Sequence, residues 1–298
     1  MNASPEPTVL VTGATGTVGE FVVEELGQRE CTVRALSRDP PADDEHAVAF
    51  DFTKPETWGR AFEGGDTLFV VRPPDITRVG STVNSAIDAA IRSGVHHVVV
   101  LSVLGAERNP LLPHRRIERH VADADCTYTF LRASFFMQNF DEVHAADIRE
   151  RDELFVPAGD GTTSFVDARD VAAVAAEALT EHGHVNRAYD LTGPEALDYH
   201  EVAAVFSDVL GRDISYRQPG ALAFGRRKLD AGEQPGFVLV MLGIYTTARL
   251  GLAGRVSDDV SWILGRDPRP LAEYVADYRA AFTPATGEPA TEVAHVQH

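Results

Sequence analysis

Three glycines near the start of the chain have the spacing of a phosphate-binding turn. Gly13, Gly16 and Gly19 follow an apolar run, Val9 to Thr12, and precede an amphipathic segment, Val18 to Gln28. In a strand-to-helix turn, such glycines let a pyrophosphate approach the N–H groups at the helix N-terminus, and the last permits close packing. Glycine spacing alone is a weak signal, but the flanking strand and helix strengthen it. We expect a dinucleotide here; the alternative is a glycine-rich turn that binds nothing.

The residues after a second apolar run predict which dinucleotide binds. An Asp or Glu at this place would bind the ribose 2′-hydroxyl of NAD, whereas this chain has Ser37 and Arg38. Arg38 can pair with a 2′-phosphate and stack on adenine, so NADP(H) is the expected cofactor. The alternative is that Arg38 pairs with Asp39 at a surface turn. Asp51 is expected either to accept a hydrogen bond from the adenine amino group or to cap a turn.

The elements that must position these residues alternate between short apolar runs and helix-period segments. The expected strands are Val9–Thr12, Thr32–Leu36, Ala47–Asp51, Thr67–Val71, His97–Ser102 and Thr127–Leu131. The expected helices are Val18–Gln28, Pro55–Phe62, Val79–Ser93, Arg115–Asp123 and Phe135–Glu150. This alternation is typical of right-handed βαβ units and a parallel sheet covered on both faces. The predicted fold class is therefore α/β, a doubly wound parallel sheet of the Rossmann type.

After about Leu154 the pattern changes to shorter and less regular elements. The expected segments are Phe165–Val166, Val171–Thr180, Ala188–Leu191, His200–Leu210, Ile214–Tyr216, Phe237–Leu250, Asp258–Leu264 and Leu271–Phe282. They predict a smaller C-terminal α+β lobe over the C-terminal edge of the sheet. We therefore predict a dinucleotide-binding domain at residues 1–153, a substrate lobe at 154–282 that either follows or interleaves with it, and a disordered tail at 283–298.

The charge of the chain excludes several classes of partner. Its 298 residues include 45 acidic and 27 basic side chains, for a formal net charge of −18, and its two lysines are Lys54 and Lys228. Such an acidic surface repels nucleic acid, and it indicates either a salt-rich, halophilic cytoplasm or a GC-rich genome that favours arginine codons. The apolar runs are of strand length, so we expect no membrane span. The N-terminus lacks the pattern of a secretory signal, which favours a cytoplasmic location.

Several motifs together resemble the NmrA-like branch of the atypical short-chain dehydrogenases/reductases, a group that includes NADPH quinone reductases and redox-sensing regulators. The segments that carry the likeness are Val9–Gly16, Ser102–Ala106, His114–His120, Thr127–Arg132, Phe135–Asn139, Gly159–Gly161, Val166–Ala172 and Leu191–Leu197. Each motif is modest, but their order along the chain is specific. The likeness covers residues 8 to about 282.

The resemblance implies a cofactor cleft formed by the loops that follow several strands. It places Thr15, Thr17 and Val18 on the phosphates, Val71, Arg72 and Pro73 after the fourth strand, and Ser102, Val103 and Leu104 after the fifth. Independently of the family, these loops follow the carboxyl ends of parallel strands, where doubly wound sheets bind ligands. The resemblance also implies that Phe135 and Phe136 face the substrate; the alternative is ordinary core packing.

The chain departs from the common proton-transfer chemistry of short-chain dehydrogenases. Most of them use Tyr-x-x-x-Lys after the fifth strand, where the Tyr hydroxyl exchanges a proton with the substrate. Here no Tyr lies between Ser102 and Tyr128, and no suitably spaced lysine follows Tyr128. Relatives of the isoflavone-reductase type place a lysine in the helix that contains His114 and Arg116, so one of these would have to replace it. Alcohol dehydrogenation by a tyrosinate-type base is therefore disfavoured.

A quinone needs less assistance, because hydride addition gives a hydroquinone anion that water or a nearby His can protonate. His114 is the candidate proton donor, with a surface histidine as the alternative. Arg116 is expected either to hold the substrate or to belong to a solvated helix face. Arg132 is expected to form an ion pair or to contact the cofactor. Cys31 and Cys126 are expected to be small buried hydrophobes, because no Cys-x-x-Cys or His-x-x-His spacing accompanies them. No Ser-His-Asp or metal-binding pattern stands out among the eleven histidines.

Two functions from different classes follow. The leading hypothesis is an NADPH-dependent reductase of a quinone or a similar conjugated, electron-poor small molecule. The rival hypothesis is a non-enzymatic redox sensor that binds NADP and acts on a protein partner. Missing proton-transfer residues favour the sensor, whereas the complete C-terminal lobe and the aromatic run at Phe135 and Phe136 favour the enzyme. The sequence pattern makes no prediction about the oligomeric state.

Overall fold

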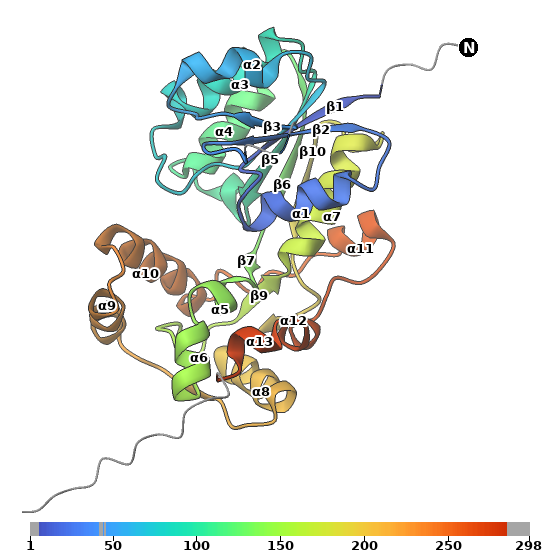
Figure 1. The fold of residues 1–298 in the computed structure, drawn as a ribbon. Coiled ribbons are helices and arrows are strands. Elements are labelled where there is room, and N and C mark those ends of the chain that lie inside the picture. The colour runs from blue at the N-terminus through green and yellow to red at the C-terminus, as the bar shows by residue number, and fades with distance from the viewer. Residues whose placement is uncertain (1–5, 42–43, 45, 285–298) are drawn as a thin grey trace, which may run out of the picture.

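Seven parallel strands form the central sheet of the chain, whose computed structural model describes residues 6–41, 44 and 46–284 (Figure 1). Their order across the sheet is β10-β6-β5-β4-β1-β2-β3. The strands are β1 (Thr8–Thr12), β2 (Thr32–Ser37), β3 (Ala47–Ala49), β4 (Thr67–Val70), β5 (His97–Val103), β6 (Thr127–Ala133) and β10 (Arg187–Leu191). All the pairs are parallel, so the predicted doubly wound α/β fold is confirmed.

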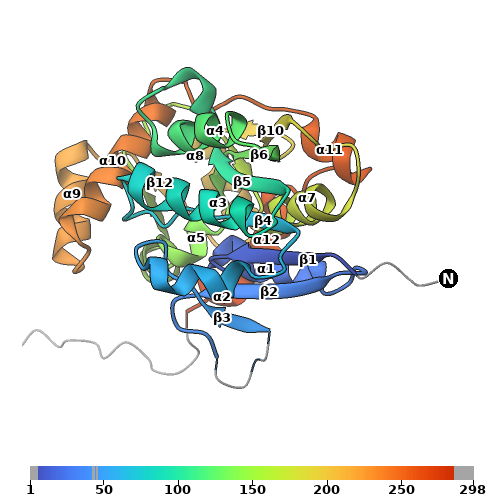
Figure 2. The same cartoon turned by 90° about the horizontal axis from the view of Figure 1, so that it is seen from above.

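Helices cover both faces of this sheet, as the view from above shows (Figure 2). One face carries α1 (Thr17–Leu26), α7 (Ala168–Thr180) and α11 (Asp259–Leu264), and the other carries α2 (Trp58–Phe62), α3 (Val83–Arg92) and α4 (Pro113–Ala122). Short 3-10 turns are η1 (Pro55–Thr57), η2 (Val79–Ser81) and η3 (Ala106–Arg108). Along β1, Val9 and Val11 join the core on the α1 side and Leu10 joins the opposite core. Burial on both faces explains why the strands read as continuous apolar runs.

A second, smaller body lies below the sheet in Figure 1 and has a core of its own. It contains a three-stranded sheet in the order β11-β9-β7 and a parallel pair, β12 and β8. Its elements are β7 (Phe135–Phe136), α5 (Asn139–Glu142), α6 (Ala145–Arg151), β8 (Glu153–Phe155), β9 (Thr163–Val166), β11 (Ala196–Leu197), α8 (Tyr199–Leu210), β12 (Ser215–Arg217), α9 (Ala221–Asp230), α10 (Pro235–Arg249), α12 (Leu271–Asp277) and α13 (Arg279–Phe282). Aromatic rings dominate this core: Phe140 lies in a tilted contact with Phe165 and in an edge-on contact with Phe206, both at centroid distances of 5.2 Å.

The expected helix from Phe135 to Glu150 is wrong. The segment begins as strand β7, in which Phe135 and Phe136 pair in parallel with Phe165 and Val166 of β9, and it continues as the two short helices α5 and α6. The pairing partner lies about thirty residues further along the chain, so the local periodicity does not reveal it. A long-range pairing has overridden the local helical pattern.

The chain returns to the central sheet after the second body has begun. β10 pairs in parallel with β6, whereas the sequence pattern places Ala188 to Leu191 in the smaller lobe. The division between residues 153 and 154 stays a prediction, and α7 and β10 lie beyond it in the sequence. The expected strand Ala47–Asp51 ends at Ala49, the expected helix Val79–Ser93 divides at Thr82, and α9 has no counterpart among the expected segments. The expected disordered tail lies outside the described residues from position 285 onward.

Candidate functional site

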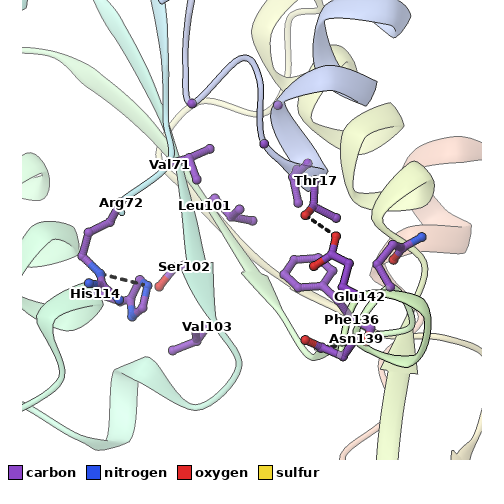
Figure 3. A pocket seen from close by; sticks show the side chains of 15 residues that line it. Thr17, Val71, Arg72, Leu101, Ser102, Val103, His114, Phe136, Asn139 and Glu142 are labelled. Atoms are coloured by element: carbon purple, nitrogen blue, oxygen red, sulfur yellow. Dashed lines mark hydrogen bonds between the residues drawn. The ribbon is translucent and has the colours of Figure 1, made fainter. Parts of the chain in front are cut away.

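A cavity of about 260 Å³ lies at the carboxyl ends of β1, β4 and β5, where the second body approaches the sheet (Figure 3). The predicted site residues that line it are Gly13, Gly16, Thr17, Val18, Gly19, Val71, Arg72, Ser102, Val103, His114 and Phe136. The lining also includes Leu101, Gln138, Asn139 and Glu142, which the sequence analysis missed. The predicted residues outside the lining are Thr15, Ser37, Arg38, Asp51, Pro73, Leu104, Phe135 and Arg116.

The glycine turn has the geometry that a pyrophosphate needs. Gly13 has a φ of +64°, and a Cβ atom built on Gly19 would stand 2.0 Å from the carbonyl oxygen of Gly13. A Cβ on Gly16 would meet only that same oxygen, at 3.4 Å, so its other sides are open. No side chain caps the N-terminus of α1, whose first N–H groups therefore remain available to an anion. These features fit the predicted cofactor.

The end of β2 offers groups for the adenosine part of a dinucleotide. Ser37 is buried, and its Oγ has no hydrogen-bond partner among the described residues. Arg38, the next residue, is exposed. The Asp51 carboxylate accepts hydrogen bonds from N and Oγ1 of Thr53, at 2.8 and 2.7 Å, as in a turn cap. Burial opposes ionisation of Asp51, but these hydrogen bonds and nearby Lys54 lower its pKa.

One polar wall of the cavity is organised by a buried carboxylate. Glu118 of α4 is fully buried and accepts hydrogen bonds from Ser102 Oγ at 2.7 Å and from Arg115 Nη1 at 2.9 Å. Arg132 donates to it through Nε and Nη2, both at 3.0 Å. Arg132 also lies 3.6 Å from Glu107. The contacts of Arg132 therefore match the ion-pair alternative, since its guanidinium serves these two carboxylates.

Arg72 and His114 form the rim beside this wall. Arg72 Nη1 donates to the carbonyl oxygens of Pro73, Pro74 and Ile76 at 2.7, 3.1 and 2.9 Å, which fixes the loop after β4. Its Nε lies 3.5 Å from Nε2 of His114 (Figure 3). Burial, together with the Arg72 charge, lowers the pKa of His114 to about 4. At neutral pH His114 is an uncharged imidazole, which is a weak acid.

The opposite wall comes from β7 and α5. Phe136 faces the cavity, and Asn139 holds its position by donating from Nδ2 to the Phe136 carbonyl oxygen at 2.9 Å. Gln138 is buried and bridges to α7, because its Nε2 donates to Asp167 Oδ1 at 3.0 Å and its Oε1 accepts from the backbone of Ala168 at 2.9 Å. Thus α7 positions this wall, although none of its residues lines the cavity.

A hydrogen bond links the glycine turn to the wall of β7 and α5. Thr17 Oγ1, at the start of α1, donates to Glu142 Oε1 of α5 at 2.6 Å, as the dashed line in Figure 3 shows. The contact brings a carboxylate to the helix terminus where the pyrophosphate is expected. The segment Phe135–Asn139 is one of the motifs that carry the family resemblance. Because the sequence pattern predicts a helix there, it does not predict which of these side chains face the cavity.

Two predicted substrate residues lie away from the lining. Phe135 packs edge-on against Phe165 at 5.7 Å and lies 6.0 Å from Tyr245, which matches the core-packing alternative. Arg116 is exposed on α4, so its role toward substrate stays a prediction. No group of three or more His, Cys, Asp or Glu side chains in the described part of the chain could hold a metal ion. None of the described helices is long and apolar enough to cross a bilayer.

Comparisons with known proteins agree with this geometry. The profile of the NmrA-like family matches residues 5–224. An NAD(P)H azoreductase from Xenophilus azovorans is 35% identical over 286 residues, covering 92% of this chain and 99% of that protein. The structure of Citrobacter sp. triphenylmethane reductase complexed with NADP(H) shares 25% identity and a TM-score of 0.81, over 91% of this chain and 99% of that one. An NADPH-dependent quinone oxidoreductase from Escherichia coli shares 25% identity and a TM-score of 0.79, with the same coverage. The chain therefore belongs to the NmrA-like family.

Proposed function

We propose that this protein is an NADPH-dependent reductase that transfers hydride to quinones, azo compounds or similar conjugated, electron-poor small molecules. The observation that carries the proposal is that a phosphate-binding turn and an apolar surface share one cavity. Val71, Leu101, Val103 and Phe136 supply that surface, against which a flat conjugated ring can pack. The names of its relatives, an azoreductase, a triphenylmethane reductase and a quinone oxidoreductase, support acceptors of this class.

The residues of the chain bind and orient the reactants. The turn from Gly13 to Gly19 and the N-terminus of α1 would hold the pyrophosphate, while Ser37 and Arg38 would hold the 2′-phosphate end. When bound, NADPH supplies a hydride, that is, a proton with two electrons. The apolar side chains exclude water from the face of the acceptor. This exclusion protects the hydride and strengthens the electrostatic interactions around the acceptor.

The second hydrogen arrives as a proton. Hydride addition leaves a negative charge on the acceptor, and half-buried Arg72 at the rim stabilises that charge. His114 beside it is uncharged at neutral pH, so water is the better proton source. Among the described residues, no Tyr or Lys lines the cavity, which leaves no such pair there to exchange a proton with an alcohol. Acceptors whose reduced anions are delocalised are therefore the ones that this site suits.

The decisive experiment follows NADPH oxidation with a benzoquinone, a naphthoquinone and an azo dye, and then NADP⁺ reduction with secondary alcohols. We expect turnover with at least one conjugated acceptor. Alcohol oxidation should be at least about 100-fold slower, because positioned proton transfer commonly contributes 10²–10⁴ in rate. Tight NADPH binding without turnover of any acceptor would overturn the proposal and return the protein to the redox-sensor hypothesis.

A further inference from the structure

The hydroxyl of Ser102 has only one hydrogen, and the structure shows where it goes. Ser102 is 2% exposed and lines the cavity, yet its Oγ lies 2.7 Å from Oε1 of Glu118, which is 0% exposed. An ionised carboxylate only accepts hydrogen bonds, so Ser102 must be the donor in this pair. The lone pairs of Ser102 Oγ then remain for whatever enters the cavity.

Glu118 is held in its ionised, accepting form from several sides. Burial raises its pKa, but the hydrogen bonds from Arg132, Ser102 and Arg115, together with the charge of Arg132, outweigh that effect and lower the pKa. Arg132 stands directly opposite Ser102 in the register of β5 and β6, so both side chains reach Glu118 from neighbouring strands. Ser102, Arg115 and Arg132 together donate four hydrogen bonds to the carboxylate. A rotation away from Ser102 would break one of these bonds to a buried charge, which is energetically costly.

We propose that Glu118 is a positioning residue that presents Ser102 to the cavity as a hydrogen-bond acceptor only, so that the site selects conjugated acceptors with an N–H or O–H beside the reducible group. The proposal rests on the proposed function and names the substrate class of that site. Arg72, on the same side of the cavity, carries only donors. The wall thus offers one donor group and one acceptor group, which complements an amino or hydroxyl substituent next to a carbonyl or azo group.

The physical reason for selectivity is the cost of mismatched polar groups. A substrate N–H facing Ser102 Oγ exchanges a hydrogen bond to water for one to the protein. A methylated analogue has no N–H to donate, so the Ser102 lone pairs and the substituent are left without partners. A site that hydrogen-bonds a substrate group therefore discriminates against analogues that lack that group. Discrimination by one neutral hydrogen bond amounts to about 3- to 10-fold in affinity.

The test compares matched ligands in a complex that cannot react. An amino-substituted naphthoquinone and its N,N-dimethylated analogue are titrated into the NADP⁺-loaded protein by calorimetry, and the same is done with an aminoazobenzene and its dimethylated analogue. For the wild-type protein we expect the N–H compound to bind about 3- to 10-fold more tightly. Ser102→Ala should bring that ratio close to one, and Ser102→Thr should retain most of it. Each protein is saturated with NADP⁺ before the titration, so the ligand ratio does not depend on its affinity for the cofactor.

Glu118→Gln tests the positioning role. It should reduce the ratio although Ser102 is intact, because an amide NH₂ group no longer guarantees an acceptor for the Ser102 hydrogen. Arg115→Gln is the matched control: it removes one contact to Oε2 of Glu118, leaves the Ser102 contact in place, and should preserve the ratio. A general destabilisation of the protein would weaken the binding of both ligands equally, so it would leave the ratio of their dissociation constants unchanged.

The outcomes separate the two proposals. A ratio near one in the wild-type protein, or a ratio unchanged by Ser102→Ala, overturns the inference, and so does a loss of NADP⁺ affinity in Ser102→Ala with an unchanged ligand ratio. Absence of NADPH turnover with every acceptor, alongside a ligand ratio that depends on Ser102, would overturn the proposed reaction and support the inference.

Discussion

The glycine turn and the wall of β7 and α5 border the same cavity but are built by different means. The wall at the glycine turn is held by the main chain: Gly16 N donates to the Gly13 carbonyl oxygen, and Glu20 N donates to the Gly16 carbonyl oxygen, both at 3.0 Å. The wall at β7 and α5 is held by side chains, such as Asn139 on the Phe136 carbonyl oxygen and Gln138 on α7. The glycine turn depends on its local sequence, whereas the wall at β7 and α5 also depends on β9 and on the start of α7, about thirty positions away.

This difference predicts how each wall responds to substitution. A main-chain wall should fail when a side chain is added at a point of close contact, and it should tolerate changes elsewhere. A side-chain wall should respond to changes in charge and hydrogen bonding, with smaller effects on the stability of the fold. The predictions below test that contrast.

Gly19→Ala should have the largest effect. Its Cβ would lie 2.0 Å from the Gly13 oxygen and 2.7 Å from the Gly13 carbonyl carbon, and because both are backbone atoms the turn itself must shift. We expect the free energy of unfolding to fall by about 3 kcal/mol or more, measured by denaturant titration. Gly16→Val is the matched control. Its Cβ has room and Gly16 has an extended conformation, so the protein should remain stable while NADPH binding is lost. Equal stability of the two variants would contradict the packing argument.

Arg38→Ala should affect the cofactor rather than the fold. A charge-assisted hydrogen bond to a phosphate contributes about 1.5–3 kcal/mol, so the dissociation constant for NADPH should rise by roughly 10- to 150-fold. NADH lacks the 2′-phosphate, and its affinity should change little. Calorimetric titrations with both dinucleotides measure this contrast. Equal losses for both would mean that Arg38 does not face a 2′-phosphate.

The part of the site that could be predicted from the sequence follows the same division. Glycine spacing and the ends of apolar strands are local signals, and together with the family resemblance they predicted Gly13, Gly16, Gly19, Val71 and Ser102, which line one cavity. The position of Phe136 depends on its pairing with Val166, which no local period encodes.

Glu118 shows the same limit in a helix. Its neighbours in the run from Arg115 to Arg119 suggest a solvated helix face, yet Glu118 is fully buried because Arg132 and Ser102 reach it from β6 and β5. The order of the strands had to be known before the partners of this carboxylate could be named.

Glu142→Gln should strengthen cofactor binding. The carboxylate of Glu142 lies at the N-terminus of α1, hydrogen-bonded to Thr17, where it repels an incoming pyrophosphate. Removing its charge keeps a hydrogen-bond acceptor for Thr17, and it should tighten NADPH binding by about 3- to 10-fold, or about 1 kcal/mol. The gain should shrink in high salt, because screening already weakens the repulsion. Weaker NADPH binding in this variant would show instead that Glu142 contacts the cofactor favourably.

His114 should have the smallest effect on activity. Its pKa of about 4 means that roughly one molecule in a thousand carries a protonated His114 at pH 7. We therefore expect kcat/KM for a quinone to show no titration of His114 between about pH 5.5 and 8. His114→Gln should change turnover by less than about threefold, far below the 10²–10⁴ that a general acid supplies. A pH profile with a pKa near 6.5 that disappears in His114→Gln would make His114 the proton donor after all.

His114 should also affect how the free energy of unfolding depends on pH under acidic conditions. Because the pKa of His114 is lowered in the folded protein, the unfolded state binds its proton near pH 6.5, whereas the folded state does so only near pH 4. The stabilisation is complete above pH 6.5 and is lost progressively as the pH falls toward 4. His114→Gln should therefore flatten the decline of the unfolding free energy across that window, whereas the exposed His182→Gln should not. Identical pH dependence in both variants would show that His114 is not buried as an uncharged group.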